Sequence, residues 1–247
     1  MLVKLKEHLA LYRAPSVWKP LLILFTIFIF QQLSAAYVVV FYAVDIFCRI
    51  GGSFNHIGLI DEFVALILLG TIRFVMAIVL ASISKRVGRR TLMFVSAAGM
   101  ILASFSTGLH MSLSSNQSSG ECSTNRTLTD ISPVEPSDST GTIAIILVLT
   151  YVCFSSFGWL VIPWTLIGEL LPVKVRGVLG GIMISVAYLG MFLMVKVAPF
   201  IMKSVSLGSI FFGLSGINIV GVAFIYFFLP ETLGKTFDDI AKYFERN

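Results

Sequence analysis

Apolar residues occur in long stretches along the whole chain, and short polar segments separate them. Six stretches stand out by length, at residues 20–43, 59–82, 91–110, 142–167, 178–202 and 207–229. A helix needs about 20 predominantly apolar residues to cross the roughly 30 Å hydrocarbon core of a bilayer. The pattern therefore predicts an all-α fold, that of a polytopic membrane protein with six transmembrane helices. The first stretch is longer than the core of a signal peptide, so we expect it to be retained.

The composition agrees with a membrane protein. Of the 247 residues, 57% are hydrophobic and 13% are charged, and the mean hydropathy is +0.92. Soluble domains carry about 25% charged residues, so the low charged fraction indicates that the lipid bilayer surrounds most of this chain. The sequence pI is about 9.2. Because the basic residues are dispersed between the apolar stretches, we expect no nucleic-acid partner.

The basic residues also predict an orientation. Thirteen of the 18 Lys and Arg residues lie before the first stretch or after the second, fourth and sixth stretches, and four lie on the opposite side. The positive-inside rule then places both termini in the cytoplasm. The chain divides into a cytoplasmic segment at 1–19, a six-helix membrane bundle at 20–229 and a cytoplasmic tail at 230–247.

The polar segment at 111–141 is expected to be an extracellular loop. It contains two sequons for N-glycosylation, at Asn116 and Asn125, and the orientation places both outside. The alternative is an unmodified, flexible polar loop. Cys48 and Cys122 fall on this same outer side, where a disulfide between them is one option, whereas Cys153 lies inside an apolar stretch and suits packing.

Three inner segments carry charged motifs at the membrane edge. They read SKRVGRRT at 84–91, GELLPVKVRG at 168–177 and PETLGKTFDDI at 230–240. Arginine can bind a carboxylate through two parallel hydrogen bonds, so the arginines and glutamates of these segments can join helix ends. The alternative is a set of solvated charges, in which each pair contributes only about 0–1 kcal/mol.

These three segments together resemble the sugar porter family of the major facilitator superfamily, which carries similar motifs in the same order and spacing. FQQLSAAYVVVFY at 30–42 and IPW at 162–164 add to the resemblance. Within the family the similarity is greatest to insect facilitated trehalose transporter-like members and related glucose facilitators. The family fold has two six-helix halves, each built from two inverted three-helix repeats, and this chain resembles the C-terminal half.

The resemblance implies facilitated transport of a sugar by alternating access. The substrate would be a hexose or a trehalose-like disaccharide, bound between this half and a missing N-terminal half or a second chain, in the plasma membrane. The alternatives are a truncated, non-transporting membrane protein that binds a partner, and a transporter of a different, anionic small organic solute. The three histidines are scattered and no catalytic motif stands in a suitable context, so we expect no enzyme, no metal and no cofactor.

The resemblance also implies two groups of functional residues. The first is a gating salt-bridge network that stabilises the outward-open state. The second is a substrate-binding wall, in which Tyr37 replaces a sugar-binding asparagine and Tyr42 matches an outer aromatic gate. Ala187 and Tyr188 replace an Asn-Trp pair. The network comprises Arg89, Arg90, Glu169, Arg176 and Glu231, and the wall comprises Gln31, Gln32, Tyr37, Tyr42, Arg73 and Trp164.

The residue spacing offers ordinary alternatives for the wall. Gln31, Ser34, Val38, Tyr42 and Asp45 recur at three- and four-residue steps, so they would share one face of a continuous first helix. A polar stripe of this kind faces protein or a water-filled cavity rather than lipid. In these alternatives the glutamines only join helices through hydrogen bonds, and Trp164 only belongs to an interfacial aromatic belt.

Arg73 is an unusual residue for the middle of an apolar stretch. It lies 12 residues before Lys85, which is about 18 Å along a helix and close to the bilayer midplane. Facing lipid would cost at least about 2.5–3.5 kcal/mol, so we expect the side chain to face the protein interior or a cavity. Three roles remain open. Arg73 can donate to sugar hydroxyls, pair with an acidic residue, or select an anionic substrate.

Overall fold

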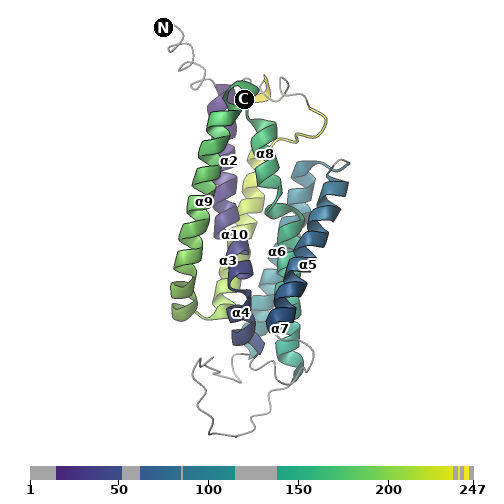
Figure 1. Ribbon diagram of the computed structural model, residues 1–247, viewed down its shortest axis with the longest axis vertical. Coiled ribbons are helices and arrows are strands. Elements are labelled where there is room, and N and C mark those ends of the chain that lie inside the picture. Colours follow the sequence, from purple (N-terminus) through teal and green to yellow (C-terminus); the bar gives the residue numbers. More distant parts are fainter. Residues whose placement is uncertain are drawn as a thin grey trace.

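The computed structural model describes residues 15–51, 62–84, 86–114, 138–235, 239 and 242–244, and all regular elements in this part are helices (Figure 1). Six helical spans in this part are long and apolar enough to cross a membrane, which confirms the predicted number. The elements, in chain order, are α2 (Pro15–Leu33), α3 (Ala36–Phe41), α4 (Ala43–Gly51), α5 (Glu62–Ile83), α6 (Arg89–Ser114), α7 (Asp138–Phe154), the π-helix η2 (Ser155–Trp159), α8 (Ile162–Leu170), α9 (Val173–Ser204) and α10 (Leu207–Phe228).

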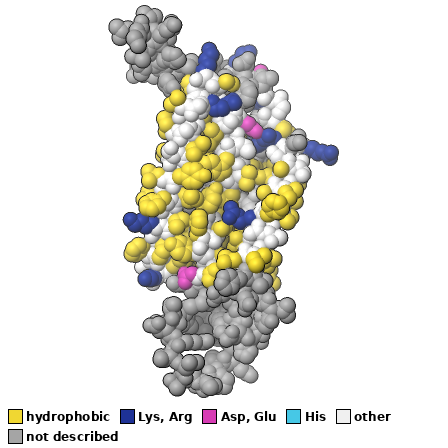
Figure 2. Space-filling model, in the orientation of Figure 1, with side chains coloured by type: hydrophobic (Ala, Val, Ile, Leu, Met, Phe, Trp, Pro, Cys, Tyr) yellow, Lys and Arg dark blue, Asp and Glu magenta, His cyan; other side chains and the backbone are white. Residues whose placement is uncertain are grey.

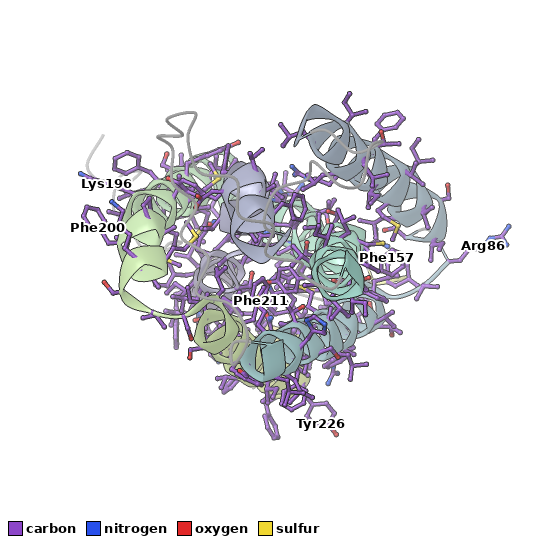
Figure 3. The ribbon with its side chains drawn as sticks, turned by 90° about the horizontal axis from the view of Figure 1, so that it is seen from below. Arg86, Phe157, Lys196, Phe200, Phe211 and Tyr226 are labelled. Atoms are coloured by element: carbon purple, nitrogen blue, oxygen red, sulfur yellow. The ribbon has the colours of Figure 1, made fainter. Side chains whose placement is uncertain are left out.

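The helices run side by side along the long axis of the molecule (Figure 1). The α5–α6 turn, the α8–α9 turn and the segment after α10 lie at one end, so the three charged motifs meet there. The bundle is held together by apolar packing around fully buried aromatic side chains, among them Phe28, Tyr151 and Trp159. Figure 3 shows Phe211 pointing into this interior, whereas Phe200 and Tyr226 point away from it.

Two helices are covered much less than the others. Only 11% of the apolar window of α5 is buried inside the chain, and the value for α9 is 22%, compared with 56% for α6. Figure 2 shows a face of the molecule over which hydrophobic side chains predominate. Burial of such surface is favourable only against lipid or another apolar protein surface, so α5 and α9 must meet one of these on their open sides.

The first span is broken, so the predicted stripe does not follow one regular helix, although Gln31, Ser34 and Val38 of that stripe are buried as a protein-facing stripe requires. Helix α2 ends at Leu33, and Ala35 adopts a left-handed conformation with φ 53° and ψ 19° before α3 begins. The Ser34 hydroxyl donates to the Gln31 carbonyl, and the Tyr151 hydroxyl donates to the Ser34 carbonyl. These side chains occupy backbone carbonyls near the break and thereby compete with regular helical pairing.

The fourth span is also irregular. Its α-helical pairing gives way to the π-helix η2, and α8 then starts with Pro163 in its first turn. The Ser96 hydroxyl of α6 donates to the Phe154 carbonyl and accepts from the Trp159 amide, so it satisfies backbone groups at both ends of the π-helix. Such segments are rare and often lie at functional sites.

Candidate functional site

A polar network joins three segments at the inner end of the bundle. The Nε and Nη2 atoms of Arg89 both lie 2.9 Å from Oε1 of Glu169, which forms the end of α8. The hydroxyl of Thr232, after α10, donates to the other Glu169 oxygen at 2.7 Å. The Glu169 carboxylate therefore ties the start of α6 to the end of α8 and to the segment after α10.

Glu231 is the second carboxylate of this network. Its Oε1 atom accepts hydrogen bonds from the backbone amides of Arg89, Thr232 and Leu233, at 3.0–3.1 Å. A side chain at Gly88 would overlap with the Glu231 carboxylate, because that group occupies the space beside the glycine. A residue without Cβ is thus required there for the carboxylate to reach the start of α6.

The structure arranges the two remaining predicted arginines differently. Arg90 donates to the Tyr226 carbonyl, and its guanidinium lies 5.7 Å and 5.4 Å from the ring centroids of Phe94 and Tyr226. Arg176 donates through two nitrogens to the Leu171 carbonyl. Both arginines therefore hold backbone and aromatic groups at the inner end, beside the cluster of Arg89, Glu169 and Glu231.

An aromatic cluster surrounds Trp164 nearer the middle of the bundle. The indole makes an edge contact with Phe28, with ring centroids 5.1 Å apart, and a tilted contact with Tyr188 at 5.5 Å. The Tyr37 hydroxyl lies in the neighbourhood of both Trp164 and Arg73. Helices α2, α3, α8 and α9 thus bring four aromatic rings to the same region, and α5 brings the Arg73 guanidinium close to it.

The predicted glutamines are bound to backbone carbonyls of neighbouring helices. Gln31 is fully buried, and its amide nitrogen donates to the carbonyls of Trp159 and Leu160 at 3.0 Å and 3.1 Å. Gln32 donates to the Ala187 carbonyl at 3.2 Å. In this arrangement Gln31 satisfies carbonyl groups at the end of the π-helix, which matches the helix-joining alternative for these residues.

The outer end of the first span is tied to α9. The Tyr42 hydroxyl donates to the Val195 carbonyl at 3.2 Å, whereas Gln31 contacts the η2–α8 junction. The break at Ala35 separates these two residues, so they face different helices. Asn116, Asn125, Cys122 and the side chain of Cys48 lie outside the described residues.

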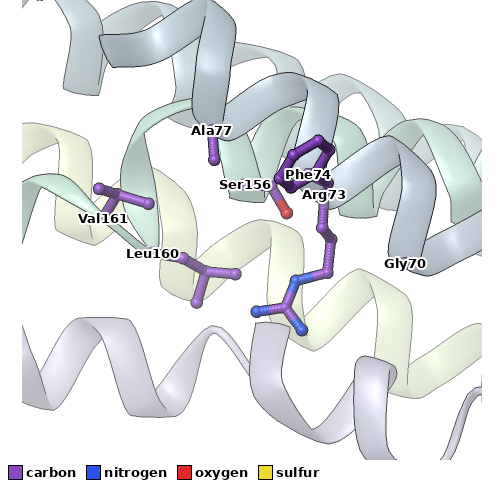
Figure 4. A pocket seen from close by; sticks show the side chains of 7 residues that line it. All are labelled: Gly70, Arg73, Phe74, Ala77, Ser156, Leu160 and Val161. Carbon is purple, nitrogen blue, oxygen red and sulfur yellow. The ribbon is translucent and has the colours of Figure 1, made fainter.

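A pocket of about 260 Å³ opens between α5 and the η2–α8 junction (Figure 4). The Arg73 guanidinium extends across it, as Figure 4 shows. Ser156 also contributes to the wall, and its hydroxyl is buried without a hydrogen-bond partner in the described part of the chain. The full lining consists of Gly70, Arg73, Phe74, Ala77, Ser156, Leu160 and Val161.

Sequence reasoning missed Ser156 as a pocket residue. The visible signal was the Ser155–Ser156 pair inside an apolar stretch, since polar side chains in a span rarely face lipid. The pocket offers a cation, a hydroxyl and apolar surface, which together suit a small polar ligand with apolar faces. No group of three His, Cys, Asp or Glu residues with the geometry of a metal site occurs within the described residues.

Comparisons with known proteins give a consistent result. Residues 4–244 match a family model described as "Sugar (and other) transporter". The chain is 30% identical over 224 residues to the facilitated trehalose transporter Tret1 of Aedes aegypti, covering 91% of this chain and 25% of that protein. It is also 30% identical over 241 residues to the facilitated glucose transporter member 8 of Bos taurus, covering 96% and 48%. The chain thus spans less than half the length of these relatives.

Solved structures agree at the level of the fold. The chain matches the proton:xylose symporter XylE, of the major facilitator superfamily, with a TM-score of 0.71 and 22% identity, covering 91% of this chain and 42% of that one. An inward-open form of the Escherichia coli xylose transporter XylE matches with a TM-score of 0.67. The predicted fold, one half of a major facilitator, is therefore confirmed.

Proposed function

Because this chain belongs to the sugar (and other) transporter family, we propose that it forms one half of a carrier that moves a sugar across a membrane by alternating access. The family is one of transporters and not of enzymes. Relatives named for trehalose and glucose transport support a hexose or a trehalose-like disaccharide as the substrate. In such carriers the substrate binds near the midplane, between the two halves.

The cluster around Trp164 is the observation that carries this proposal. An indole offers a flat apolar surface for the faces of a sugar ring and one N–H donor for its hydroxyls. Trp164 is partly buried between Phe28 and Tyr188, and the Tyr37 hydroxyl lies beside it. The adjacent pocket adds the Arg73 guanidinium and the Ser156 hydroxyl, so apolar and hydrogen-bonding groups converge as sugar binding requires.

The glutamines have a positioning role in this proposal. Gln31 and Gln32 hold the η2–α8 junction and α9 against α2, which sets the place of Trp164 and Tyr188. The side-chain amide oxygen of Gln31 (Oε1) has no hydrogen-bond partner among the described residues and is left to accept from a bound hydroxyl or water. Tyr42 binds α9 further out, where an outer gate would close.

The inner network would act as a latch in the transport cycle. Arg89, Glu169 and Glu231 join helix ends that belong to different parts of the half. If these contacts form in one state of the carrier and part in the other, they bias the equilibrium between outward and inward access. Arg90 and Arg176 would stiffen the helix ends that the latch joins.

A second six-helix unit would complete the substrate cavity. The open surfaces of α5 and α9 support this part of the proposal, because each is too apolar to face water. The unit would be an N-terminal half of the same protein or a second chain. The orientation proposed from the basic residues places the inner network in the cytoplasm and Asn116 and Asn125 outside, at the plasma membrane.

The substitution Trp164→Ala tests the proposed function. Uptake of radiolabelled glucose and trehalose is measured in cells that express the native protein containing this chain. Loss of the ring is expected to lower uptake roughly tenfold or more while surface expression persists. Trp18→Ala is a matched control, because Trp18 is exposed near the start of α2 and makes none of the ring contacts of the cluster. Unchanged uptake by Trp164→Ala would contradict the site assignment.

A further inference from the structure

Arg73 brings a permanent positive charge into the membrane part of the protein. It lies near the middle of α5 (Glu62–Ile83) and is partly buried. A guanidinium does not lose its proton in proteins, so the charge persists at this depth. A charge near the bilayer centre is costly unless a partner or a water-filled cavity compensates it.

The described residues supply no ion-pair partner for this guanidinium. The ion pair that the structure gives is that of Arg89 with Glu169 at the inner end, and the pocket around Arg73 contains no carboxylate. The polar neighbours are neutral. Tyr37 interacts with Arg73 electrostatically, and the Ser156 hydroxyl is buried in the same pocket without a partner. The charge of Arg73 is thus directed into a space that a ligand can enter.

The surroundings of the guanidinium leave room for such a ligand. A Cβ added at Gly70 would meet no atom within 4 Å, and Ala77 is also small. Figure 4 shows the guanidinium extending away from α5, with Gly70 and Ala77 on either side of Arg73. Tyr37 lies in the neighbourhood of both the guanidinium and Trp164, which is the sugar-stacking residue of the proposed function. One ligand can therefore contact the ring and the charge at the same time.

We propose that Arg73 binds an acidic group of the transported sugar, so that the site selects a monosaccharide bearing a carboxylate over its neutral counterpart. This inference rests on the proposed function, because it concerns the same cavity. A carboxylate accepts two parallel hydrogen bonds from a guanidinium and cancels its charge. A neutral hydroxyl would accept one bond and leave the charge uncompensated in a medium of low dielectric constant. The Ser156 hydroxyl donates a further hydrogen bond to the same group.

The experiment compares two sugars that differ only at C6. The native protein containing this chain is purified into lipid nanodiscs, and binding of D-glucuronate and D-glucose is titrated at constant ionic strength. We expect glucuronate to bind roughly tenfold more tightly than glucose. In Arg73→Gln the affinity for glucuronate should fall roughly tenfold more than the affinity for glucose, so that the preference for glucuronate is lost. Arg73→Lys keeps the positive charge but cannot form the two parallel hydrogen bonds of a guanidinium, so it should give an intermediate preference for glucuronate over glucose.

Lys196→Gln is a control matched in charge. Lys196 is exposed on α9 and points away from the interior in Figure 3, so its loss should leave the preference for glucuronate unchanged. Equal or tighter binding of glucose by the unmodified protein overturns the inference, even if Arg73→Gln does not fold. Equal effects of Arg73→Gln on both sugars, or no effect on either, also overturn it. Glucose binding that depends on Trp164 would then leave the proposed function standing, whereas failure of both sugars to bind would refute both.

Discussion

The contact between Arg89 and Glu169 offers a direct measure of how strongly the inner ends of the helices are joined. The perturbation is Glu169→Gln, which keeps the shape of the side chain and removes its charge. The carboxylate accepts two hydrogen bonds from the Arg89 guanidinium and one from Thr232. After the substitution only one of the two oxygens remains as an acceptor, and the partly buried guanidinium loses its counter-charge.

The size of the effect follows from the exposure of the two side chains. They are 21% and 26% exposed, so solvent screens the pair less than a fully exposed one. Fully exposed pairs contribute about 0.2–1 kcal/mol, and hydrogen bonds to charged groups contribute about 1.5–3 kcal/mol. We therefore expect Glu169→Gln to lower the free energy of unfolding by about 2 kcal/mol and the coupling between the two residues to be about 1–2 kcal/mol.

A double-mutant cycle measures that coupling. The free energy of unfolding is determined by denaturant titration in detergent micelles for the unmodified protein, Glu169→Gln, Arg89→Gln and the double variant. Arg86→Gln serves as a control, because Arg86 is exposed in the same turn. Additive single effects, with a coupling below about 0.5 kcal/mol, would refute the reasoning and make these residues independent solvated charges.

Two further predictions concern the first helical break and the outer loop. Ala35→Gly should raise the free energy of unfolding by about 0.5–1 kcal/mol, because glycine adopts the left-handed conformation of Ala35 without steric cost. Ala36→Gly, one residue later and inside α3, should lower it, and a loss of stability in both variants would contradict the assigned break. Glycosidase treatment should increase the electrophoretic mobility of protein from eukaryotic cells, and the shift should disappear in Asn116→Gln combined with Asn125→Gln. If the protein without substitutions shows no shift, the prediction that this loop is glycosylated is wrong.

The spans and the motif segments could be predicted because their signals are local. Twenty apolar residues in a row identify a membrane helix without knowledge of its neighbours. The motif with Arg89 and the motif with Glu169 each stand directly at the end of such a span, so their meeting at one end followed from the topology. For the same reason Arg73 could be assigned to the midplane of its helix.

The breaks in the helices could not be predicted because their causes lie far away in the chain. Ala35 carries no local signal for a left-handed conformation, and the contact beside it comes from Tyr151, more than 100 residues later. The π-helix likewise depends on Ser96 of α6. The irregular fourth span decides which carbonyls Gln31 contacts, and residue spacing in the first span could not name them.

The way in which Glu231 is held has a consequence for how the inner end tolerates sequence variation. Three main-chain amides bind its carboxylate, and every residue type except proline supplies such an amide. The side chains at positions 89, 232 and 233 can therefore diverge between relatives without loss of this contact. Selection to preserve the Glu231 contact would act on Glu231 itself and on Gly88, where any side chain would overlap the carboxylate. If replacement of Arg89 has only a mild effect, the reason would be that its backbone amide still binds Glu231. Such a result would not mean that the segments are unconnected.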